Sequence, residues 1–487
     1  MDDKNLSVVM VTPEAAPFAR TGGLGDVAGS LPAALSSRGL RTAVIMPYYQ
    51  CIRESGIKAP VVVNGLSISL GADILVASVR KTRTPDGVDV YFLEREDLYD
   101  RPNLYSCPAG DYYDNLQRFS FFCHAVLKTA VELDLRPDII HCHDWQASLV
   151  APLLAGPYRN VKGLNNSRCI FTIHNIGYQG IFTGESLPVT GLSKETFFQV
   201  EGLEYWGKIN LMKGGIVYSD AVTTVSPSYA LEIQTPRFGM GLEGVLRKRS
   251  GSLRGILNGI DYRVWNPAVD PLIPANYSAA DMNGKLECKR SLMASSGLES
   301  SLNRPLIGIV SRLDRQKGLD LVAEAVDSLL ELDTALVILG TGDREIQDRL
   351  EHAAARMPRR MAFTATFNDE LAHRIIAGSD ILLVPSLYEP CGLTQIYALK
   401  YGTVPVVCAV GGLEDTVIDA GDFPNRGNGF KFKQHDAPSL LNAVKRAVEV
   451  FDQPKEWQKI VATAMASDFS WNKSAEQYLA LYHAMVD

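Results

Sequence analysis

Residues 6–26 read LSVVMVTPEAAPFARTGGLGD, and this stretch indicates the fold class. Its first six residues form a nearly continuous apolar run, which is typical of a strand covered by helices on both faces. The loop that follows contains prolines and glycines and leads to Asp26, where we expect a helix to begin. A strand, a glycine-rich loop and a helix in this order open a doubly wound α/β sheet.

The same alternation of short apolar runs and helical stretches continues along the chain. We predict further strands over residues 42–46, 138–141, 169–173 and 221–225. The alternation starts again after Arg304, with predicted strands over residues 306–310, 335–339, 381–384 and 404–407. The sequence therefore predicts two Rossmann-like domains, each with a mostly parallel, doubly wound sheet.

The boundary between the two domains is expected where the alternation weakens. Residues 258–304 contain several prolines and show little periodicity, so we place an N-terminal domain at 1–258 and a C-terminal domain at 259–487. Open α/β sheets bind ligands beyond the carboxyl ends of their strands. Two such domains facing each other are expected to form a deep cleft, and the chemistry is expected there.

Composition excludes several classes of function. A net charge of −7 argues against a nucleic-acid partner. No apolar run approaches the roughly 18–20 residues that a membrane span needs. The eight cysteines include no Cys-x-x-Cys pair, which argues against a disulfide framework or a structural zinc site. We therefore expect a cytoplasmic protein without a membrane partner.

The glycine-rich loop after the first predicted strand is a candidate phosphate site. Gly22 and Gly23 lack a Cβ, so a phosphate could approach the backbone at the start of a helix. Arg20 could add a bidentate contact to the same phosphate. The alternative interpretation is a tight turn that needs glycine for its backbone conformation alone.

The corresponding loop of the second half is rich in cations. Residues 311–318 read SRLDRQKG and place Arg312, Arg315 and Lys317 directly after a predicted strand. Fixed cations of this kind stabilise the negative charge that develops on a departing nucleoside diphosphate, so that no metal is obligatory. The alternative is a solvated charged loop.

Another candidate site follows the predicted strand at 381–384. Glu389 could bind sugar hydroxyls or stabilise positive charge at an anomeric carbon, which is oxocarbenium-like during glycosyl transfer. The backbone amides of Gly392, Leu393 and Thr394 could hold a phosphate. The alternative role for Glu389 is a favourable charge near a helix N-terminus.

Residues 141–145 read HCHDW and invite comparison with a metal site. His141 and His143 would lie on one side of a strand and Cys142 on the other, with no further ligand cluster nearby, so we expect no metal. A sugar site fits better, with Asp144 accepting hydrogen bonds from hydroxyls and Trp145 stacking on a pyranose ring. His174 and Asn175 follow the next predicted strand and have the same character.

These motifs, in this order, make the sequence similar to the bacterial glycogen synthases and plant starch synthases. That family, GT5, consists of retaining glycosyltransferases with the two-domain GT-B fold. The matching stretches are RTGGLGDVAGSLP from residue 20, HCHDWQASL from 141, FTIHNIGYQG from 171, GMGLEG from 239, ILNGID from 256, VSRLDRQKGLD from 310, LGTGD from 339, PSLYEPCGLTQIYALKYGTVPVV from 385 and GGLEDTV from 411.

The resemblance implies a role for each candidate residue. Arg312 and Lys317 resemble the pair that neutralises the donor diphosphate, Glu389 resembles the carboxylate near the transferred glucose, and His174 resembles the residue that contacts this sugar near its anomeric carbon. It further implies that the last helix, over about 470–487, crosses back to the first domain. Other implied contacts to donor or sugar are Asp144, Asn175, Asn258, Gly392, Leu393 and Thr394, with Asp26 as a partner of the Arg20 loop.

The resemblance also implies the reaction. The expected activity transfers glucose from ADP-glucose to the non-reducing 4-hydroxyl end of an α-1,4-glucan such as glycogen, without a metal, a cofactor or a covalent intermediate. The alternatives are a UDP-glucose-dependent synthase, a glucan phosphorylase that needs pyridoxal phosphate, and a glucan-binding module that binds no nucleotide.

The sequence departs from the family pattern at two positions. Arg20 stands where bacterial and plant members usually have lysine. Some UDP-glucose-dependent synthases also have arginine at this position. We still expect ADP-glucose, because the remaining motifs follow the bacterial branch. Tyr397 stands eight residues after Glu389, where a second glutamate is common in related enzymes; tyrosine matches the starch synthase branch.

Overall fold

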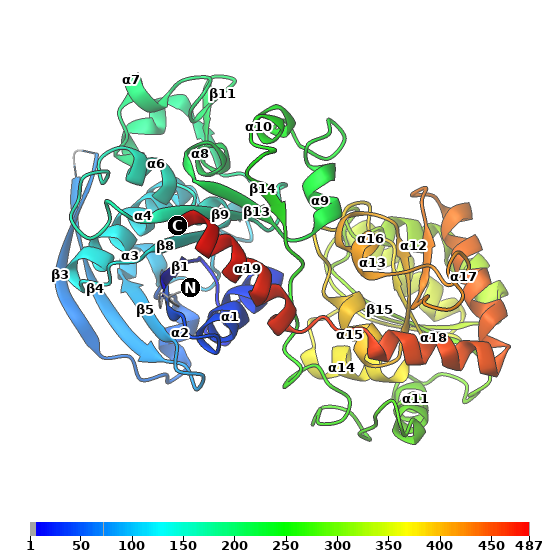
Figure 1. Ribbon diagram of the computed structural model, residues 1–487. Helices are drawn as coiled ribbons and strands as arrows, with labels where there is room; N and C mark the ends of the chain where they lie inside the picture. Colours follow the sequence, from blue (N-terminus) through cyan, green and yellow to red (C-terminus); the bar gives the residue numbers. More distant parts are fainter. Residues whose placement is uncertain (1–5, 72, 487) are drawn as a thin grey trace. The chain divides into compact units, whose positions relative to one another are not determined.

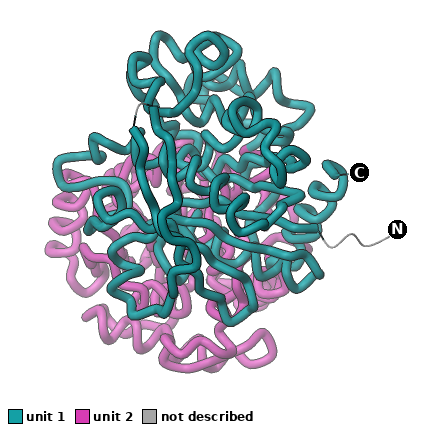
Figure 2. Tube along the Cα trace, turned by 90° about the vertical axis from the view of Figure 1, so that its left-hand side faces the viewer, with its two compact units in different colours: residues 1–225, 230–259, 471–487 teal, residues 226–229, 260–470 magenta. Residues whose placement is uncertain are grey.

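The protein divides into two compact units, shown in different colours in Figure 2. The computed structural model describes residues 6–71 and 73–486. Unit 1 comprises Met1–Val225, Ala230–Gly259 and Trp471–Asp487, and unit 2 comprises Ser226–Tyr229 and Ile260–Ser470. Each unit is built around a large sheet of its own.

Unit 1 is built on a twisted sheet in which strand β1 lies near the middle (Figure 1). The strand order is β14-β13-β9-β8-β1-β2-β5-β4-β3, with β4 antiparallel to both of its neighbours and the other pairs parallel. The strands are β1 (Ser7–Val11), β2 (Arg41–Pro47), β3 (Val61–Leu70), β4 (Asp73–Arg83), β5 (Asp89–Glu94), β8 (Ile139–His143), β9 (Arg168–Ile173), β13 (Ala221–Thr224) and β14 (Leu253–Gly255).

Continuous apolar sequence explains the central position of β1. All five of its residues are buried, since helices cover both faces of a doubly wound sheet. Its register pairs Val9 with Ala43 of β2 on one side and with Ile140 of β8 on the other. The strands predicted in this half correspond to β1, β2, β8, β9 and β13, each within two residues at its ends.

Helices and short hairpins complete unit 1. The helix α9 (Pro227–Glu232) has residues in both units. The other helices are α1 (Gly23–Ser36), α2 (Gln50–Glu54), α3 (Glu96–Tyr99), α4 (Asn115–Glu132), α5 (Asp144–Ala147), α6 (Val150–Ala155), the 3-10 helix η1 (Gly184–Thr190), α7 (Lys194–Phe197), α8 (Leu211–Tyr218), α10 (Glu243–Lys248) and α19 (Trp471–Val486). The short strands are β6 (Ser106–Cys107), β7 (Gly110–Asp111), β10 (Ile181–Thr183), β11 (Glu204–Tyr205) and β12 (Lys208–Asn210).

The first helix begins earlier than the sequence predicted. It starts at Gly23, with Gly22 as an extended N-cap residue that has no side chain to cap it, and Asp26 lies inside the first turn. The amide of Gly25 donates to the carbonyl of Gly22 and closes that turn. Asp26 is paired with Arg20 instead of capping the helix, which is why the predicted start at Asp26 is wrong.

The C-terminal helix α19 belongs to unit 1, where it lies beside α1 (Figure 1). Arg38, two residues beyond the end of α1, donates to the carbonyl of Asn472 and to Glu476. Tyr478 and Tyr482 on the inner side of α19 are fully buried. The chain re-enters unit 1 between residues 470 and 471, so sequence-distant segments form one core.

Unit 2 is built on a sheet in which every neighbouring pair is parallel, with the order β17-β16-β15-β18-β19-β20. Its strands are β15 (Leu306–Val310), β16 (Ala335–Leu339), β17 (Met361–Thr364), β18 (Ile381–Val384), β19 (Val404–Cys408) and β20 (Phe430–Phe432). Its helices are α11 (Asn283–Ser295), α12 (Leu319–Glu331), α13 (Arg344–Arg356), α14 (Asp369–Gly378), α15 (Thr394–Lys400), α16 (Gly411–Thr416), α17 (Ala437–Phe451) and α18 (Pro454–Ala466).

The segment that opens unit 2 is fixed by an aromatic stack. The indole of Trp265 lies between the rings of His373 and Tyr397, with centroid distances of 3.8 Å on both sides. The buried carboxylate of Asp270 accepts hydrogen bonds from His373 and from the hydroxyl of Tyr401. Tyr397 therefore packs against the irregular segment that opens unit 2.

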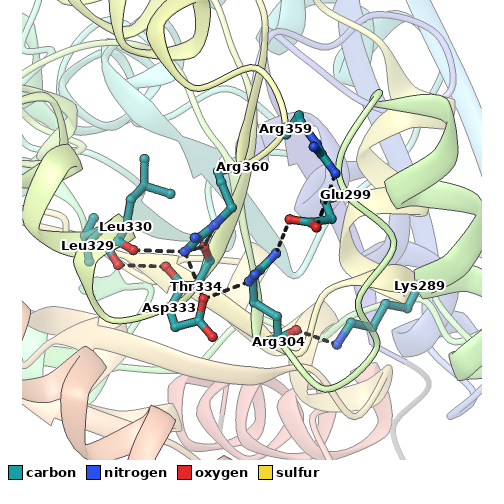
Figure 3. Close-up of polar contacts among 9 residues, drawn as sticks. All are labelled: Lys289, Glu299, Arg304, Leu329, Leu330, Asp333, Thr334, Arg359 and Arg360. Atoms are coloured by element: carbon teal, nitrogen blue, oxygen red, sulfur yellow. Dashed lines mark hydrogen bonds and ion pairs between the residues drawn. The ribbon is translucent and has the colours of Figure 1, made fainter.

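A polar network fixes the amino-terminal end of the unit 2 sheet (Figure 3). Arg304, just before β15, pairs with Glu299 and Asp333. Lys289 on α11 donates to the carbonyl of Arg304 and forms a 2.7 Å ion pair with the carboxylate of Asp380. The Lys289 side chain is 3% exposed, so its charge is compensated almost entirely by these protein groups.

We expect Lys289→Met to destabilise the protein by about 3–5 kcal/mol, because it leaves the carboxylate of Asp380, which is only 14% exposed, without its cation. Arg290→Met is the matched control on the same helix, since Arg290 is half exposed and pairs with Glu287 three residues earlier. Its expected effect is within about 0.5 kcal/mol. Urea unfolding measures both; equal effects would show that the Lys289 pair contributes no more than a surface contact.

Candidate active site

Two strand ends of unit 1 bring the candidate sugar-binding residues together. Strands β8 and β9 are parallel neighbours, with His143 opposite Thr172, so the residues that follow them lie at the same edge of the sheet. Asp144 comes directly after β8, and His174 comes directly after β9. The amide of His174 donates to Asp144 Oδ1 over 2.7 Å. The structure thus joins two residues that are thirty positions apart.

Asp144 is the central residue of a strand-end cluster that consists of Asp144, His174 and Asn175. It has a left-handed backbone, with φ of 56°, and its carboxylate receives the amides of both His174 and Asn175. Burial raises the pKa of the Asp144 carboxyl to about 7, and these two amide hydrogen bonds oppose that shift. Asn175 in turn accepts from the amide of Gly177, which closes a tight turn.

The raised pKa of Asp144 has a consequence for stability. A carboxyl titrates near 3.9 in an unfolded chain, so between about pH 4 and pH 7 the folded state holds more protons than the unfolded state. The contribution of Asp144 to stability therefore falls as pH rises through this window and is constant above it. We expect Asp144→Asn, which keeps an oxygen acceptor and tolerates positive φ, to lack this loss.

The measurement is the melting temperature of both proteins from pH 5 to pH 8. We expect the variant's melting temperature, relative to that of the native protein, to rise up to about pH 7 and then to level off. A difference that stayed constant throughout or moved in the opposite direction would contradict the raised pKa of Asp144.

The rings of His141, His143 and His174 form a row in which each ring is tilted against its neighbour. The rings of His141 and His143 have centroids 4.3 Å apart, and His143 Nδ1 lies 3.0 Å from His174 Nε2. Burial lowers the pKa of His143 to about 3 and holds the pKa values of His141 and His174 well below the usual range. All three imidazoles are therefore neutral near pH 7.

The HCH motif at residues 141–143 raises the question of a metal site in the part of the chain that the structure describes. No group of three or more histidine, cysteine or acidic side chains is placed to share an ion there. The two ring nitrogens of His141 are instead bonded to the hydroxyls of Tyr482 and Thr172, at 2.8 and 2.6 Å. Hydrogen bonding inside the core accounts for the motif.

The glycine-rich loop of unit 1 is held by a buried carboxylate that was not among the residues predicted from the sequence. Glu14 accepts hydrogen bonds from the amide and hydroxyl of Thr21 and from the hydroxyl of Tyr105. It is 3% exposed, and burial raises the pKa of its carboxyl. An acidic residue three positions beyond a buried strand was the available signal.

The loop leaves open space at one of its glycines. A Cβ added to Gly22 would meet nothing within 4 Å, whereas at Gly25 it would come within 2.6 Å of the Arg20 side chain. Arg20 forms a 3.1 Å ion pair with Asp26, so the expected partnership within this loop is present. Gly22 and Gly23 are exposed at the start of α1, while Gly25 is needed for close packing.

Trp145 and Asn258, two further residues of unit 1 that were predicted to bind substrate, are both buried. The Trp145 ring is 8% exposed and packs edge-on against Phe119, with Gly180 directly beneath it. This packing accounts for Trp145 as part of the core, so we do not propose it as a sugar contact. Asn258 is also buried, but its Oδ1 has no hydrogen-bond partner among the described residues, so it remains a candidate for contacting a ligand.

In unit 2, the loops after β15 and β18 form a single polar site. Lys317 Nζ lies 2.6 Å from Glu389 Oε2, and the hydroxyl of Ser386 donates to the same oxygen over 2.8 Å. The two loops touch directly at Gly318, which has φ of 71° and where a Cβ would overlap the carbonyl oxygen of Pro385. Any other residue at Gly318 would push the loops apart.

The remaining predicted residues of unit 2 lie close in sequence to either Lys317 or Glu389. Arg312 is half exposed and lies 3.5 Å from Asp314, whose carboxylate also accepts the amide of Lys317. Gly392 has φ of 68°, and Thr394 is the first residue of α15 with Leu393 as its N-cap. The two loops that follow β15 and β18 thus contain cations, a fixed carboxylate and the backbone amides at the start of α15.

The arrangement defines a class of protein. Two doubly wound units have their polar groups at the carboxyl ends of parallel strands, and one carries a cation–carboxylate pair suited to a nucleoside diphosphate and a sugar. These are the features of a glycosyltransferase with the GT-B fold. Within residues 6–71 and 73–486, every helix is too short or too polar to cross a bilayer.

Comparisons with known proteins agree with this class. The starch synthase catalytic domain family matches residues 7–248, and the group 1 glycosyl transferases match residues 295–462. The chain is 42% identical to a glycogen synthase of Koribacter versatilis, over 98% of both chains. It is 44% identical to a glycogen synthase of Anaeromyxobacter sp., covering 99% of this chain and 100% of the relative.

Solved structures give the same result. The catalytic domain of starch synthase IV from Arabidopsis thaliana, bound to ADP and acarbose, superposes with a TM-score of 0.92 at 35% identity, over 99% of both chains. A sucrose-phosphate synthase from Thermosynechococcus elongatus shares the fold, with a TM-score of 0.61 at 19% identity. The chain belongs to the glycogen and starch synthase family and is a glucosyltransferase, which confirms the fold and family predicted from the sequence.

Proposed function

We propose that this protein transfers glucose from ADP-glucose to the non-reducing 4-hydroxyl end of an α-1,4-glucan, with retention of configuration. The observation that carries the proposal is the Lys317–Glu389 pair, with Arg312 in the same loop. ADP and acarbose, both bound by the Arabidopsis relative, support the choice of an adenine nucleotide and an α-glucan.

The unit 2 residues would act on the donor. Lys317 and Arg312 would bind the diphosphate and stabilise the negative charge that grows on it as the bond to glucose breaks. Glu389 would be held in place through Oε2 by Lys317 and Ser386, which leaves Oε1 to accept hydrogen bonds from sugar hydroxyls. Because these cations carry the charge compensation, we propose that the reaction needs no divalent metal and no cofactor.

The unit 1 residues would act on the sugars. Asp144 fixes the turn that contains His174 and Asn175 through two backbone amides, so both side chains are held at the strand end. Asn258 would offer its unpaired Oδ1 to the donor or sugar. Gly22 and Gly23 would accept close approach of a phosphate beside the Arg20–Asp26 pair.

The setting of the reaction is also part of the proposal. The eight cysteines, all within the described residues, form no disulfide with one another. This state fits a reducing compartment, and we propose a cytoplasmic enzyme. The substrates would be a nucleotide sugar and glycogen or a related α-glucan.

Donor preference is tested by competition between ADP-glucose and UDP-glucose, with glycogen as acceptor and EDTA present, in the native protein and in Arg20→Lys. We expect ADP-glucose to be preferred by both proteins, because Arg20 pairs with a carboxylate next to the glycine loop and would contact phosphate, which the two donors share. Preference for UDP-glucose in the native protein, reversed in Arg20→Lys, would show that Arg20 selects the base. Loss of transfer in EDTA would contradict the metal-free reaction.

A further inference from the structure

His143 is a buried residue of unit 1 for which the proposed reaction has no direct use. It ends strand β8, is 0% exposed, and bonds through Nδ1 to Nε2 of His174 over 3.0 Å. Its other nitrogen, Nε2, is buried without a hydrogen-bond partner among the described residues. One of its two polar atoms is therefore directed at a candidate catalytic side chain.

A bond between two imidazole nitrogens restricts where the protons lie. Both rings are neutral, so each carries one proton, and one ring must donate while the other accepts. If His174 donated from Nε2, the proton of His143 would have to lie on its own Nε2, where the described residues offer it no acceptor. If His143 donates from Nδ1, the unpaired atom is a bare ring nitrogen. Among backbone groups, a buried N–H without an acceptor is rarer than an unpaired buried acceptor, and we apply the same preference to these two rings.

The second arrangement fixes the state of His174. Its Nε2 is then occupied as an acceptor, so its proton lies on Nδ1. That nitrogen has no hydrogen-bond partner among the residues described, and it is absent from the set of fully buried unpaired atoms. The accessible polar atom of His174 is therefore an N–H donor.

We propose that His143 is a positioning residue that holds His174 in the Nδ1–H tautomer, so that His174 donates a hydrogen bond to an oxygen of the sugar substrate. The substrate contact depends on the proposed glucosyl transfer, whereas the tautomer depends only on the two rings. The arrangement follows the general rule that the hydrogen bond on one nitrogen of a histidine decides what the other nitrogen can do.

Contacts with His141 explain why His143 keeps its orientation. The His141 ring lies against it, and His141 is itself fixed at both nitrogens by Tyr482 of α19 and Thr172 of β9. The proton donor for His174 is thus held between two strands and the C-terminal helix. Rotation of the His143 ring would require the His141 ring, which is held by two hydrogen bonds, to move.

The tautomer is tested directly in the full chain labelled with 15N-histidine, by two-bond 1H–15N spectra that distinguish Nδ1–H from Nε2–H rings. The signals of His174 are assigned by their loss in His174→Asn. We expect His174 in the native protein to be the Nδ1–H tautomer. An Nε2–H tautomer at His174 would overturn the proposal, whatever the activity of the protein.

Activity is tested with His143→Leu and His143→Asn, using ADP-glucose and glycogen. Leucine removes the donor, and we expect kcat to fall at least about tenfold while KM for ADP-glucose changes little. Asparagine can place an amide N–H near the position of Nδ1, and we expect it to restore kcat to within about threefold of native. Leucine without effect, or asparagine no better than leucine, would contradict the positioning role.

His124→Leu is the matched control. His124 is a buried, doubly hydrogen-bonded histidine of unit 1 on α4, bonded to Tyr158 and the carbonyl of Thr190. We expect it to lower the melting temperature as His143→Leu does, but to leave kcat within about twofold and the His174 tautomer unchanged. If native protein transferred no glucose at all, the proposed function would fail, while the spectra would still decide the relation between His143 and His174.

Discussion

Lys317→Ala is expected to lower kcat by about 100-fold to 1000-fold. Lys317 would supply positive charge to the diphosphate as it leaves, and it also fixes Glu389 through a 2.6 Å ion pair. Alanine removes both contributions and leaves Glu389, which is 6% exposed, with the Ser386 hydroxyl on its Oε2. Steady-state transfer from ADP-glucose to glycogen measures the loss.

Two variants separate these contributions. Ser386→Ala removes only the neutral hydrogen bond to Glu389, and we expect a loss of about fivefold to tenfold, equivalent to roughly 1 kcal/mol. Lys445→Ala removes an exposed lysine of α17 that pairs at 3.9 Å with Glu449, and we expect no change. A Lys317→Ala protein that turned over at the native rate would remove Lys317 from its assigned role.

Glu14→Leu is expected to lower kcat/KM for ADP-glucose by roughly 100-fold, equivalent to about 3 kcal/mol. The carboxylate of Glu14 receives the amide and hydroxyl of Thr21 and the hydroxyl of Tyr105, all of which would lose their acceptor inside the protein. The loop that contains Arg20 and Gly22 would then lose its fixed position. The expected loss is in kcat/KM because this loop would bind the donor phosphate.

Tyr105→Phe is the control for this prediction. It removes one donor to Glu14 and leaves both contacts with Thr21, so we expect a loss within about fivefold. Thermal melting of both variants shows whether they remain folded. Native kcat/KM in a folded Glu14→Leu protein would mean that the loop holds its conformation without the carboxylate.

Much of the fold could be predicted because strand sequence and burial are directly linked. Strands β1, β15 and β18 are short and apolar almost throughout, and a parallel sheet covered on both faces buries the side chains of such strands. The candidate site could be predicted for a related reason. Lys317 and Glu389 both follow parallel strands, and the carboxyl ends of those strands meet at one edge of the sheet.

The features that the sequence did not predict depend on contacts between distant segments. In the sequence Glu14 looks like an ordinary loop residue, because Tyr105, whose hydroxyl donates to it, lies ninety-one positions away. Trp145 suggested a stacking platform, but whether an indole is exposed depends on Phe119 and Gly180, which pack around it. The tautomer of His174 likewise depends on a ring from the neighbouring strand.

The central claim is that a glucosyl unit leaves a nucleoside diphosphate and joins a glucan, and product stoichiometry tests it most directly. Glucose-labelled ADP-glucose is incubated with glycogen and EDTA, and both polymer-bound label and free ADP are followed over time. We expect one ADP for each glucose that enters the polymer, and complete release of the label by an enzyme that cleaves only α-1,4 bonds. The contradicting result is polymer without label from ADP-glucose or UDP-glucose, with glucose 1-phosphate formed instead when glycogen and phosphate are supplied.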